Sequence, residues 1–235
     1  MKFRARLVEG RLIRRYKRFL ADVQLRDQGV VTAACPNTGS MMGCCDAGNR
    51  VWLSESDRAT RKYRHTWEIV EVGRVMIGIN TGLPNALVAE AIRDGTIGEL
   101  GGYASARSEV AYGEESSRVD FVLEAPRRKP CYVEVKNVTA AVAKGVALFP
   151  DCVSERASRH LRELMRLKAS GARPVQLYCV QRGDVREVRP ADGIDHEYGE
   201  TLREAIAAGV EVLAYRARVT PSEIRLAERI PVVCP

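Results

Sequence analysis

A long hydrophobic run is missing from this 235-residue sequence. No apolar stretch approaches the roughly 20 residues that a membrane-spanning helix requires. The basic N-terminus, MKFRARLVEGRLIRRYKRF, has no uninterrupted apolar core behind its charges, unlike a secretory signal peptide. We therefore expect a cytoplasmic protein that does not use a membrane as its partner.

The seven cysteines lack the spacing of a disulfide framework. No C-x-x-C motif occurs, and Cys44 and Cys45 are adjacent in the chain. Because the ligand spacings of zinc proteins are missing, the three cysteines of residues 35–45 and His65 do not predict a zinc site. Reduced thiols in an intracellular protein are the better interpretation.

Internal repeats and low-complexity segments are also absent from the sequence. The hydrophobic fraction of 46% and the charged fraction of 29% are those of an ordinary globular protein. The length suits one large domain or two small ones, and either could bury a core.

Negative charge is scarce in the first third of the chain. Residues 1–80 contain 15 Lys and Arg against 8 Asp and Glu, whereas residues 81–235 contain 22 of each. The net charge of +7 therefore lies in the first region, with eight basic residues among the first 18. Such a concentrated positive field attracts polyanions and predicts a phosphate backbone as partner. A solvated basic face without a partner is the alternative.

The first 80 residues favour short strands separated by turns, with no convincing helix. Asp27-Gln28-Gly29 is a turn signal, and the loop from Cys35 to Ser40 is rich in Pro, Asn and Gly. Five or six strands suit a small barrel such as the OB-fold, which often binds nucleic acids. The expected strands are residues 7–16, 19–26, 30–35, 51–54, 67–72 and 75–79.

From residue 81 the pattern changes to helices between strands. Asn85 is expected to cap a helix that ends near Asp94, with Gly95 as the stop signal. The box Thr220-Pro221-Ser222-Glu223 predicts a last helix. From 86 to 181 the predicted order is helix, three strands, helix, strand. The other expected helices are 151–170 and 198–208, and the expected strands are 108–112, 119–123, 131–138, 175–181 and 210–215.

Charged residues on two apolar strands form the candidate site. In the segment CYVEVKN at 131–137, alternation places Glu134 and Lys136 on one face while Val133 and Val135 point into a core. The preceding strand carries Asp120. Because the connection at 124–130 permits an antiparallel pair, Asp120 could lie beside Glu134.

Two carboxylates at close range repel each other unless a cation neutralises them. Mg²⁺ or Mn²⁺, held by Asp120, Glu134 and the Val135 carbonyl, would do so and would activate water toward a phosphodiester. Lys136 could orient that water or stabilise developing negative charge, and Glu90 could add a carboxylate through a water on the metal. The alternative is an ordinary ion pair between Glu134 and Lys136 on a solvated strand, worth under about 1 kcal/mol.

Further residues are candidates for contacts with DNA. Basic residues interleaved with aromatics near the N-terminus suit phosphate contacts and base stacking, although Phe19 is better explained as barrel core. On the predicted helix at 151–170, Arg156 and His160 share one side, which could face a phosphate, or they could be ordinary surface charges. The remaining candidates are Arg14, Arg15, Tyr16, Lys17, Arg18 and Arg118.

Long strings in the same order along nearly the whole chain resemble the sugar fermentation stimulation protein A family. They are GRLIRRYKRF at 10–19, CPNTGSM at 35–41, GINTGLPN at 78–85, SRVDF at 117–121, YVEVKNVT at 132–139 and FPDCVSERASRHLREL at 149–164.

The resemblance implies an OB-like domain at 1–80 and, at 81–235, a restriction-endonuclease-like domain of the PD-(D/E)xK type with αβββαβ order. It also implies DNA binding and a part in regulating sugar-utilisation genes. On that pattern Asp120, Glu134 and Lys136 occupy the nuclease signature positions, and Glu90 matches a helix glutamate.

Three functions are consistent with these observations. The first is a DNA-binding protein with a Mg²⁺- or Mn²⁺-dependent phosphodiesterase site, and the second is a DNA-binding regulator whose similar site does not cut. The third is a carbohydrate or nucleotide binder that uses the barrel, which the basic excess disfavours for neutral sugars.

Overall fold

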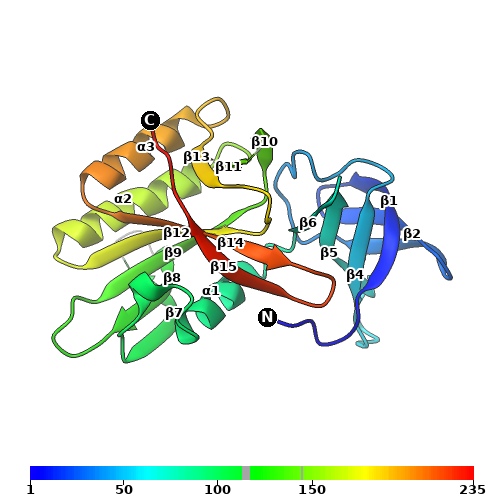
Figure 1. Cartoon of the computed structure of the whole chain (residues 1–235), viewed down its shortest axis with the longest axis horizontal. Helices are drawn as coiled ribbons and strands as arrows, with labels where there is room; N and C mark the ends of the chain where they lie inside the picture. The colour runs from blue at the N-terminus through cyan, green and yellow to red at the C-terminus, as the bar shows by residue number, and fades with distance from the viewer. Residues whose placement is uncertain (113–116, 144) are drawn as a thin grey trace.

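Two structural units follow one another along the chain. The structure, a computed structural model, describes residues 1–112, 117–143 and 145–235. Figure 1 shows a small β-barrel beside a larger domain in which helices cover both faces of a sheet. Among the described residues, no helix is both long enough and apolar enough to cross a membrane.

Strands β1 to β5 close the N-terminal barrel, and β6 pairs with β5 as a sixth strand. The sheet order is β3-β2-β1-β4-β5-β6, and a parallel pairing of β3 with β5 at Ala33 and His65 closes the ring. This closure confirms the predicted OB-like barrel. The strands are β1 (Val8–Tyr16), β2 (Leu20–Leu25), β3 (Gly29–Ala34), β4 (Arg50–Glu55), β5 (His65–Val72) and β6 (Val75–Gly78).

The barrel core follows from residues that alternate between the two faces of each strand. On β1, Gly10 and Leu12 point inward, and a Cβ on Gly10 would lie 2.5 Å from Val23 Cγ1. Trp67 is fully buried and donates its indole N–H to the Ile69 carbonyl at 3.0 Å. Each large apolar side chain buried in this way contributes about 1.5–3 kcal/mol.

The placement of Phe19 in the core was wrong. Its side chain is 51% exposed. Tyr16 pairs with Leu20, so Phe19 belongs to the three-residue turn of the β1–β2 hairpin and not to a strand. Lys17 and Arg18 in the same turn have positive φ angles of 50° and 63°.

The C-terminal domain is built on a mixed sheet of order β15-β14-β12-β9-β8-β7. Strands β9, β12 and β14 are parallel, and the others are antiparallel to their neighbours. The elements are α1 (Pro84–Arg93), a 3-10 turn (Gly98–Leu100), β7 (Ser105–Tyr112), β8 (Ser117–Glu124), β9 (Cys131–Val138), β10 (Ala141–Ala143), β11 (Val146–Phe149), α2 (Glu155–Ala169), β12 (Arg173–Val180), β13 (Glu187–Pro190), α3 (His196–Ala207), β14 (Glu211–Val219) and β15 (Ile224–Ile230).

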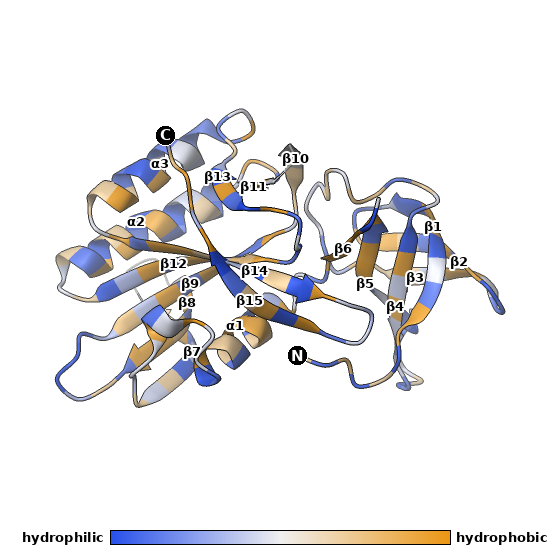
Figure 2. Cartoon of the chain, viewed as in Figure 1, coloured by the Kyte–Doolittle hydropathy of each residue, from blue (hydrophilic) through white to orange (hydrophobic). Residues whose placement is uncertain are grey.

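Helices cover both faces of this sheet. Leu87 of α1 packs in the core of one face, whereas Leu161 of α2 and Leu202 of α3 pack together on the other. Figure 2 shows apolar residues along the central strands and mixed polar and apolar surfaces on the helices. The predicted order of helix, three strands, helix and strand is confirmed. The small sheet β10-β11-β13 was not predicted, because its strands are only three or four residues long.

The start of α1 differs from the prediction. Leu83 is the N-cap residue and Pro84 occupies the first turn, so Asn85 lies inside the helix. Proline is well suited to that position because it lacks the amide hydrogen that would have no partner there. Asn85 is thereby free to use its side chain in a tertiary contact.

The predicted last helix was wrong, because the segment forms strand β15. Thr220 does accept the Glu223 amide at 3.1 Å, as in a helix cap, but the chain then turns back along β14. Ile224, Leu226 and Ile230 are buried, with exposed residues between them. Pairing with β14 and burial of these side chains outweigh the local capping signal.

Candidate metal and phosphodiester site

Adjacent antiparallel strands bring the two candidate carboxylates together. Strand β8 pairs with β9 through Phe121 and Val133, and one step further along this register Asp120 faces Glu134. Val133 and Val135 of β9 are buried in the domain core, so alternation turns Glu134 toward the opposite face.

Asp120 is held by hydrogen bonds to both carboxylate oxygens. Asn85 Nδ2 donates to Oδ1 at 2.8 Å, and the Val135 amide donates to Oδ2 at 2.7 Å. Burial raises the pKa of Asp120, and the nearby charge of Glu134 raises it further. Asp120 is therefore a carboxylate whose negative charge the protein only partly compensates.

Glu134 is almost fully buried, with 3% of its surface exposed. Its Oε1 accepts Lys136 Nζ at 2.8 Å and also contacts His160 Nδ1. Burial opposes its ionisation, but the hydrogen bond from His160 and the charge of Lys136 outweigh burial and lower the pKa of Glu134. Its Oε2 is buried and has no hydrogen-bond partner among the described residues.

An unpartnered buried oxygen beside a second, poorly compensated carboxylate fits a divalent cation. The Val135 carbonyl is suitably directed, because the N–H and C=O of a strand residue point to the same edge and its N–H already reaches Asp120. Among the described residues, no group of three or more His, Cys, Asp or Glu side chains is arranged to hold a metal. The site would resemble a Mg²⁺ site, which uses one or two carboxylates and completes its shell with oxygens from water and phosphate.

His160 of α2 is buried, with 3% of its surface exposed, so it faces the interior of the domain and not the solvent. Arg156 Nε donates to His160 Nε2 at 3.3 Å, which leaves the Nδ1 hydrogen for Glu134. The imidazole therefore fixes the orientation of Glu134, and the exposed Arg156 is the member of this pair that could contact a phosphate.

The structure does not bring Glu90 to the carboxylate pair. Its Oε1 accepts the amino group of Met1 at 2.8 Å. At about 100° per residue, α1 turns Glu90 roughly 140° away from Asn85, which is the helix residue that reaches Asp120. Arg118 has an exposed side chain on β8, the strand of Asp120.

The basic candidates of the barrel fall into two groups. Arg14 pairs with Asp22 at 2.8 Å and lies over the Tyr16 ring, with its guanidinium carbon 4.9 Å from the ring centroid. Arg15 donates to three backbone carbonyls, including those of Asn37 and Gly39 at 2.9 Å each. These residues support the barrel, whereas the side chains of Lys17 and Arg18 are exposed in the hairpin turn.

Asn85 was not predicted as a site residue, and His160 was predicted in a different role. Asn85 lies 35 residues from its partner Asp120, and His160 lies 26 residues from Glu134. Only the string GINTGLPN, which contains Asn85, could have drawn attention to it from the sequence.

Comparisons with known proteins give consistent results over the full chain. The SfsA N-terminal OB domain matches residues 13–79, and the sugar fermentation stimulation protein RE domain matches residues 82–223. A sugar fermentation stimulation protein homolog of Thioalkalivibrio sulfidiphilus is 57% identical over 230 residues, covering 98% of this chain and 96% of that protein. The homolog of Geobacter metallireducens is 58% identical over 233 residues, covering 99% and 100%.

A solved structure is also similar. The Pyrococcus furiosus SfsA in complex with Ca²⁺ superimposes with a TM-score of 0.86 at 25% sequence identity, covering 99% of this chain and 98% of that chain.

Proposed function

Because the chain belongs to the sugar fermentation stimulation protein family, we propose that it binds DNA and cleaves phosphodiesters with a divalent cation. The membership confirms the resemblance found in the sequence. The observation that supports this function best is the pair of carboxylates, half-buried Asp120 and buried Glu134, in a restriction-endonuclease-type domain. The Ca²⁺ complex of the similar archaeal protein supports a divalent cation.

The residues of the site have distinct roles in this proposal. Asp120, Glu134 and the Val135 carbonyl would hold Mg²⁺ or Mn²⁺, which supplies a Lewis acid and positive charge beside the phosphodiester. The ammonium group of Lys136 contacts the Glu134 carboxylate and would stabilise the negative charge that develops on the phosphate. Asn85 and His160 keep the two carboxylates in position.

The barrel and the exposed basic residues would hold the DNA backbone. The excess of positive charge lies in the first 80 residues, where Lys17 and Arg18 occupy an exposed turn. Arg118 and Arg156 extend this basic surface onto the second domain. Affinity should fall steeply with salt, because each phosphate contact releases counterions. A salt-independent affinity would argue against this interface.

Cleavage tests the proposal directly. The full chain and its Glu134→Ala variant would be incubated with linear, circular and single-stranded DNA at low salt, with Mg²⁺ or Mn²⁺. We expect cleavage by the unsubstituted protein that EDTA and the substitution abolish. Equal cleavage by both proteins would indicate a contaminating nuclease and contradict the assignment.

A regulator that binds DNA without cutting is the second candidate. It is favoured by the engagement of Lys136, whose ammonium lies 2.8 Å from Glu134 Oε1 and 3.2 Å from His160 Nδ1. It also agrees with the sugar-fermentation name of the family. A gel shift without cleavage under any of these conditions would support this function, with control of sugar-utilisation genes as its consequence.

A further inference from the structure

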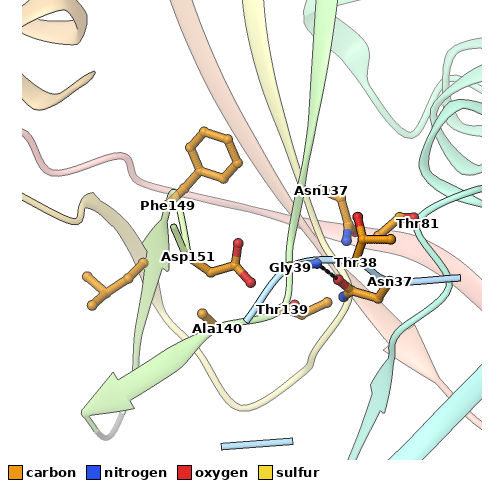
Figure 3. A pocket seen from close by; sticks show the side chains of 10 residues that line it. Asn37, Thr38, Gly39, Thr81, Asn137, Thr139, Ala140, Phe149 and Asp151 are labelled. Carbon is orange, nitrogen blue, oxygen red and sulfur yellow. Dashed lines mark hydrogen bonds between the residues drawn. The ribbon is translucent and has the colours of Figure 1, made fainter. Parts of the chain in front are cut away.

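A small cavity lies between the barrel and the C-terminal domain. Its volume is about 280 Å³, near the lower end of the range for small-ligand sites. Figure 3 shows the loop of residues 37–39 approaching the end of β9 and Asp151 across this cavity. Thr81, from the connection between the two domains, completes the wall.

The cavity wall combines polar groups with the apolar side chains of Ala140, Leu148 and Phe149, and its described residues include no cationic side chain. Asn37, Asn137 and Thr139 supply amides and a hydroxyl, and Asp151 supplies a carboxylate. A phosphate inside the cavity would therefore meet the Asp151 carboxylate with no Lys or Arg side chain in the described lining, whereas a neutral group with hydrogen-bond donors and acceptors would be well matched.

The loop that forms one wall is held in place before any ligand binds. The Asn37 and Gly39 carbonyls accept Arg15 Nη2, and Asn37 Oδ1 accepts the Gly39 amide at 2.9 Å. Asp151 Oδ2 accepts the Ser40 hydroxyl at 3.2 Å. A Cβ on Gly39 would lie 2.5 Å from Asp151 Oδ2, so only glycine allows this close approach.

Hydrogen-bonding capacity remains available inside the cavity. Asn137 Oδ1 accepts Gln181 Nε2 at 2.7 Å, which directs the Asn137 amide nitrogen away from that contact. In the part of the chain that the structure describes, neither this nitrogen nor the Thr139 hydroxyl has a hydrogen-bond partner. One donor and one hydroxyl are thus available to a ligand, beside an Asp151 carboxylate whose Oδ2 already accepts the Ser40 hydroxyl and the Met41 amide.

The cavity adjoins the carboxylate site along the chain. Asn137 directly follows Lys136 on β9, and Thr81 precedes by four residues the Asn85 that holds Asp120. The exposed turn of the barrel is also near, because the charge of Arg18 acts on the thiol of Cys152, whose pKa is raised by burial and by Asp151. Because alternation turns Asn137 to the face of β9 opposite to Glu134 and Lys136, a DNA strand held by this turn would pass over the end of β9 to reach both the cavity and the carboxylates.

We propose that this inter-domain pocket binds an unpaired nucleobase of the DNA strand whose phosphodiester lies at Asp120 and Glu134. The inference rests on the proposed function and makes it more specific, because a base can enter the pocket only from single-stranded or locally unpaired DNA. Asp151 accepts hydrogen bonds and therefore favours a base whose donor is not flanked by other acceptors. The exocyclic amino group of cytosine is such a donor, whereas the N3–H of an unpaired thymine lies between two carbonyl oxygens that the carboxylate repels.

Fluorescence anisotropy of labelled DNA tests this pocket. The full chain would be titrated in EDTA, which prevents metal-dependent cleavage, with a short oligodeoxycytidine, an oligothymidine of equal length and a duplex. We expect the oligodeoxycytidine to bind about tenfold more tightly than the oligothymidine, because the cytosine amino group can donate to the Asp151 carboxylate without placing a carbonyl oxygen beside it. Thr139→Val should weaken the binding of the oligodeoxycytidine about fivefold and leave the binding of the duplex unchanged.

Two further variants make the result specific. Asp151→Leu removes the carboxylate acceptor, so it should abolish the preference for cytosine over thymine while duplex binding remains. Thr96→Val removes a hydroxyl from the loop after α1, away from the pocket, and should bind all three probes like the unsubstituted protein.

Each other outcome overturns the inference in a recognisable way. Equal affinities for all three probes, unchanged by Thr139→Val, would remove the base pocket but leave DNA binding intact. No binding of any probe would remove the proposed function as well. Stabilisation of the protein by glucose but not by deoxycytidine, lost in Thr139→Val, would identify a sugar pocket instead.

Discussion

Two sets of buried charge in the C-terminal domain are compensated to different degrees. Arg182, 7% exposed, donates to both oxygens of Asp184 at 2.7 and 2.8 Å and to the Thr139 carbonyl at 2.9 Å. Burial opposes the ionisation of Asp184, but the hydrogen bond and charge of Arg182 outweigh it and lower its pKa. Asp120, in contrast, has a raised pKa, and its neighbour Glu134 has an unpartnered oxygen.

This difference indicates that Arg182 and Asp184 form a structural ion pair, whereas Asp120 and Glu134 form a ligand site. A charge that only supports the fold obtains its partners from the protein, since an uncompensated buried charge is costly. Among the described residues Glu134 Oε2 has no such partner and the pKa of Asp120 is raised, so this pair can gain compensation from a cation in solution. Perturbed pKa values of this kind are typical of functional sites. Substitutions in the two sets should therefore have opposite effects on stability and activity.

The largest expected effect is on catalysis. Glu134→Ala should reduce DNA cleavage at least about a hundredfold, because it removes a cation ligand that acts on the reacting phosphate. DNA affinity in EDTA should change less than about twofold, since the backbone contacts lie elsewhere. Single-turnover cleavage and anisotropy measure the two effects, and a parallel loss of both would indicate a general structural role.

Removing the imidazole of His160 should act through Glu134. His160→Ala should weaken Mn²⁺ binding about tenfold to a hundredfold, the usual effect of losing a residue that orients a metal ligand. His160→Gln, which can still donate to Glu134, should recover part of the affinity. Calorimetric titration distinguishes this role from a packing role, which would lower the melting temperature of both variants without a difference in Mn²⁺ affinity.

Breaking the ion pair between Arg182 and Asp184 should lower the stability of the fold without changing DNA cleavage. Asp184→Ala leaves Arg182 buried without its partner, and we expect a loss of about 2–3 kcal/mol in the free energy of unfolding, given that Asp184 is 31% exposed. Urea unfolding measures this loss. Cleavage per folded molecule should remain normal, and a matched loss of Mn²⁺ affinity would break the distinction between the two sets.

The smallest expected effect is a gain in stability for Asp120→Asn, opposite in sign to the loss expected for Asp184→Ala. Because the pKa of Asp120 is raised in the folded protein, the native state holds its proton more tightly than the unfolded state. The metal-free protein therefore loses stability as pH rises from the ordinary aspartate value through the raised one. Asp120→Asn avoids this loss and should melt at a higher temperature than the unsubstituted protein in EDTA at pH 8.

The same comparison near pH 4 provides the control for Asp120→Asn. As the pH falls toward the ordinary aspartate pKa, the native carboxyl takes up its proton and the difference in melting temperature should shrink. A variant that melts at a lower temperature at both pH values would show that the carboxylate is structurally compensated after all.

The sequence predicts those parts of the site that depend on local periodicity. Alternation along β9 placed Glu134 and Lys136 on one face, and the short connection to β8 brought Asp120 opposite. Asn85 and His160 could not be assigned in this way, because their contacts depend on how α1 and α2 pack on the sheet. An Asn before a helix has the same local signal whether it caps the helix or binds a distant carboxylate.

Local signals were also overruled by tertiary structure. The hydrogen bond of the Thr220 box does form, but the chain continues as β15 because Ile224 and Leu226 gain more from burial against the sheet. Phe19 has the character of a core residue and is nevertheless exposed, since the barrel register assigns it to a turn. Register and packing, which decided both cases, are not encoded in any short segment.

A direct test of the central claim is a calorimetric titration of the full chain with Mn²⁺, compared with Glu134→Gln. Glutamine preserves the size of the side chain and accepts hydrogen bonds from Lys136, but it removes the negative charge that the cation needs. The account predicts one Mn²⁺ per chain for the unsubstituted protein and none for the variant. Equal binding by the two proteins, or no binding by either, would contradict it.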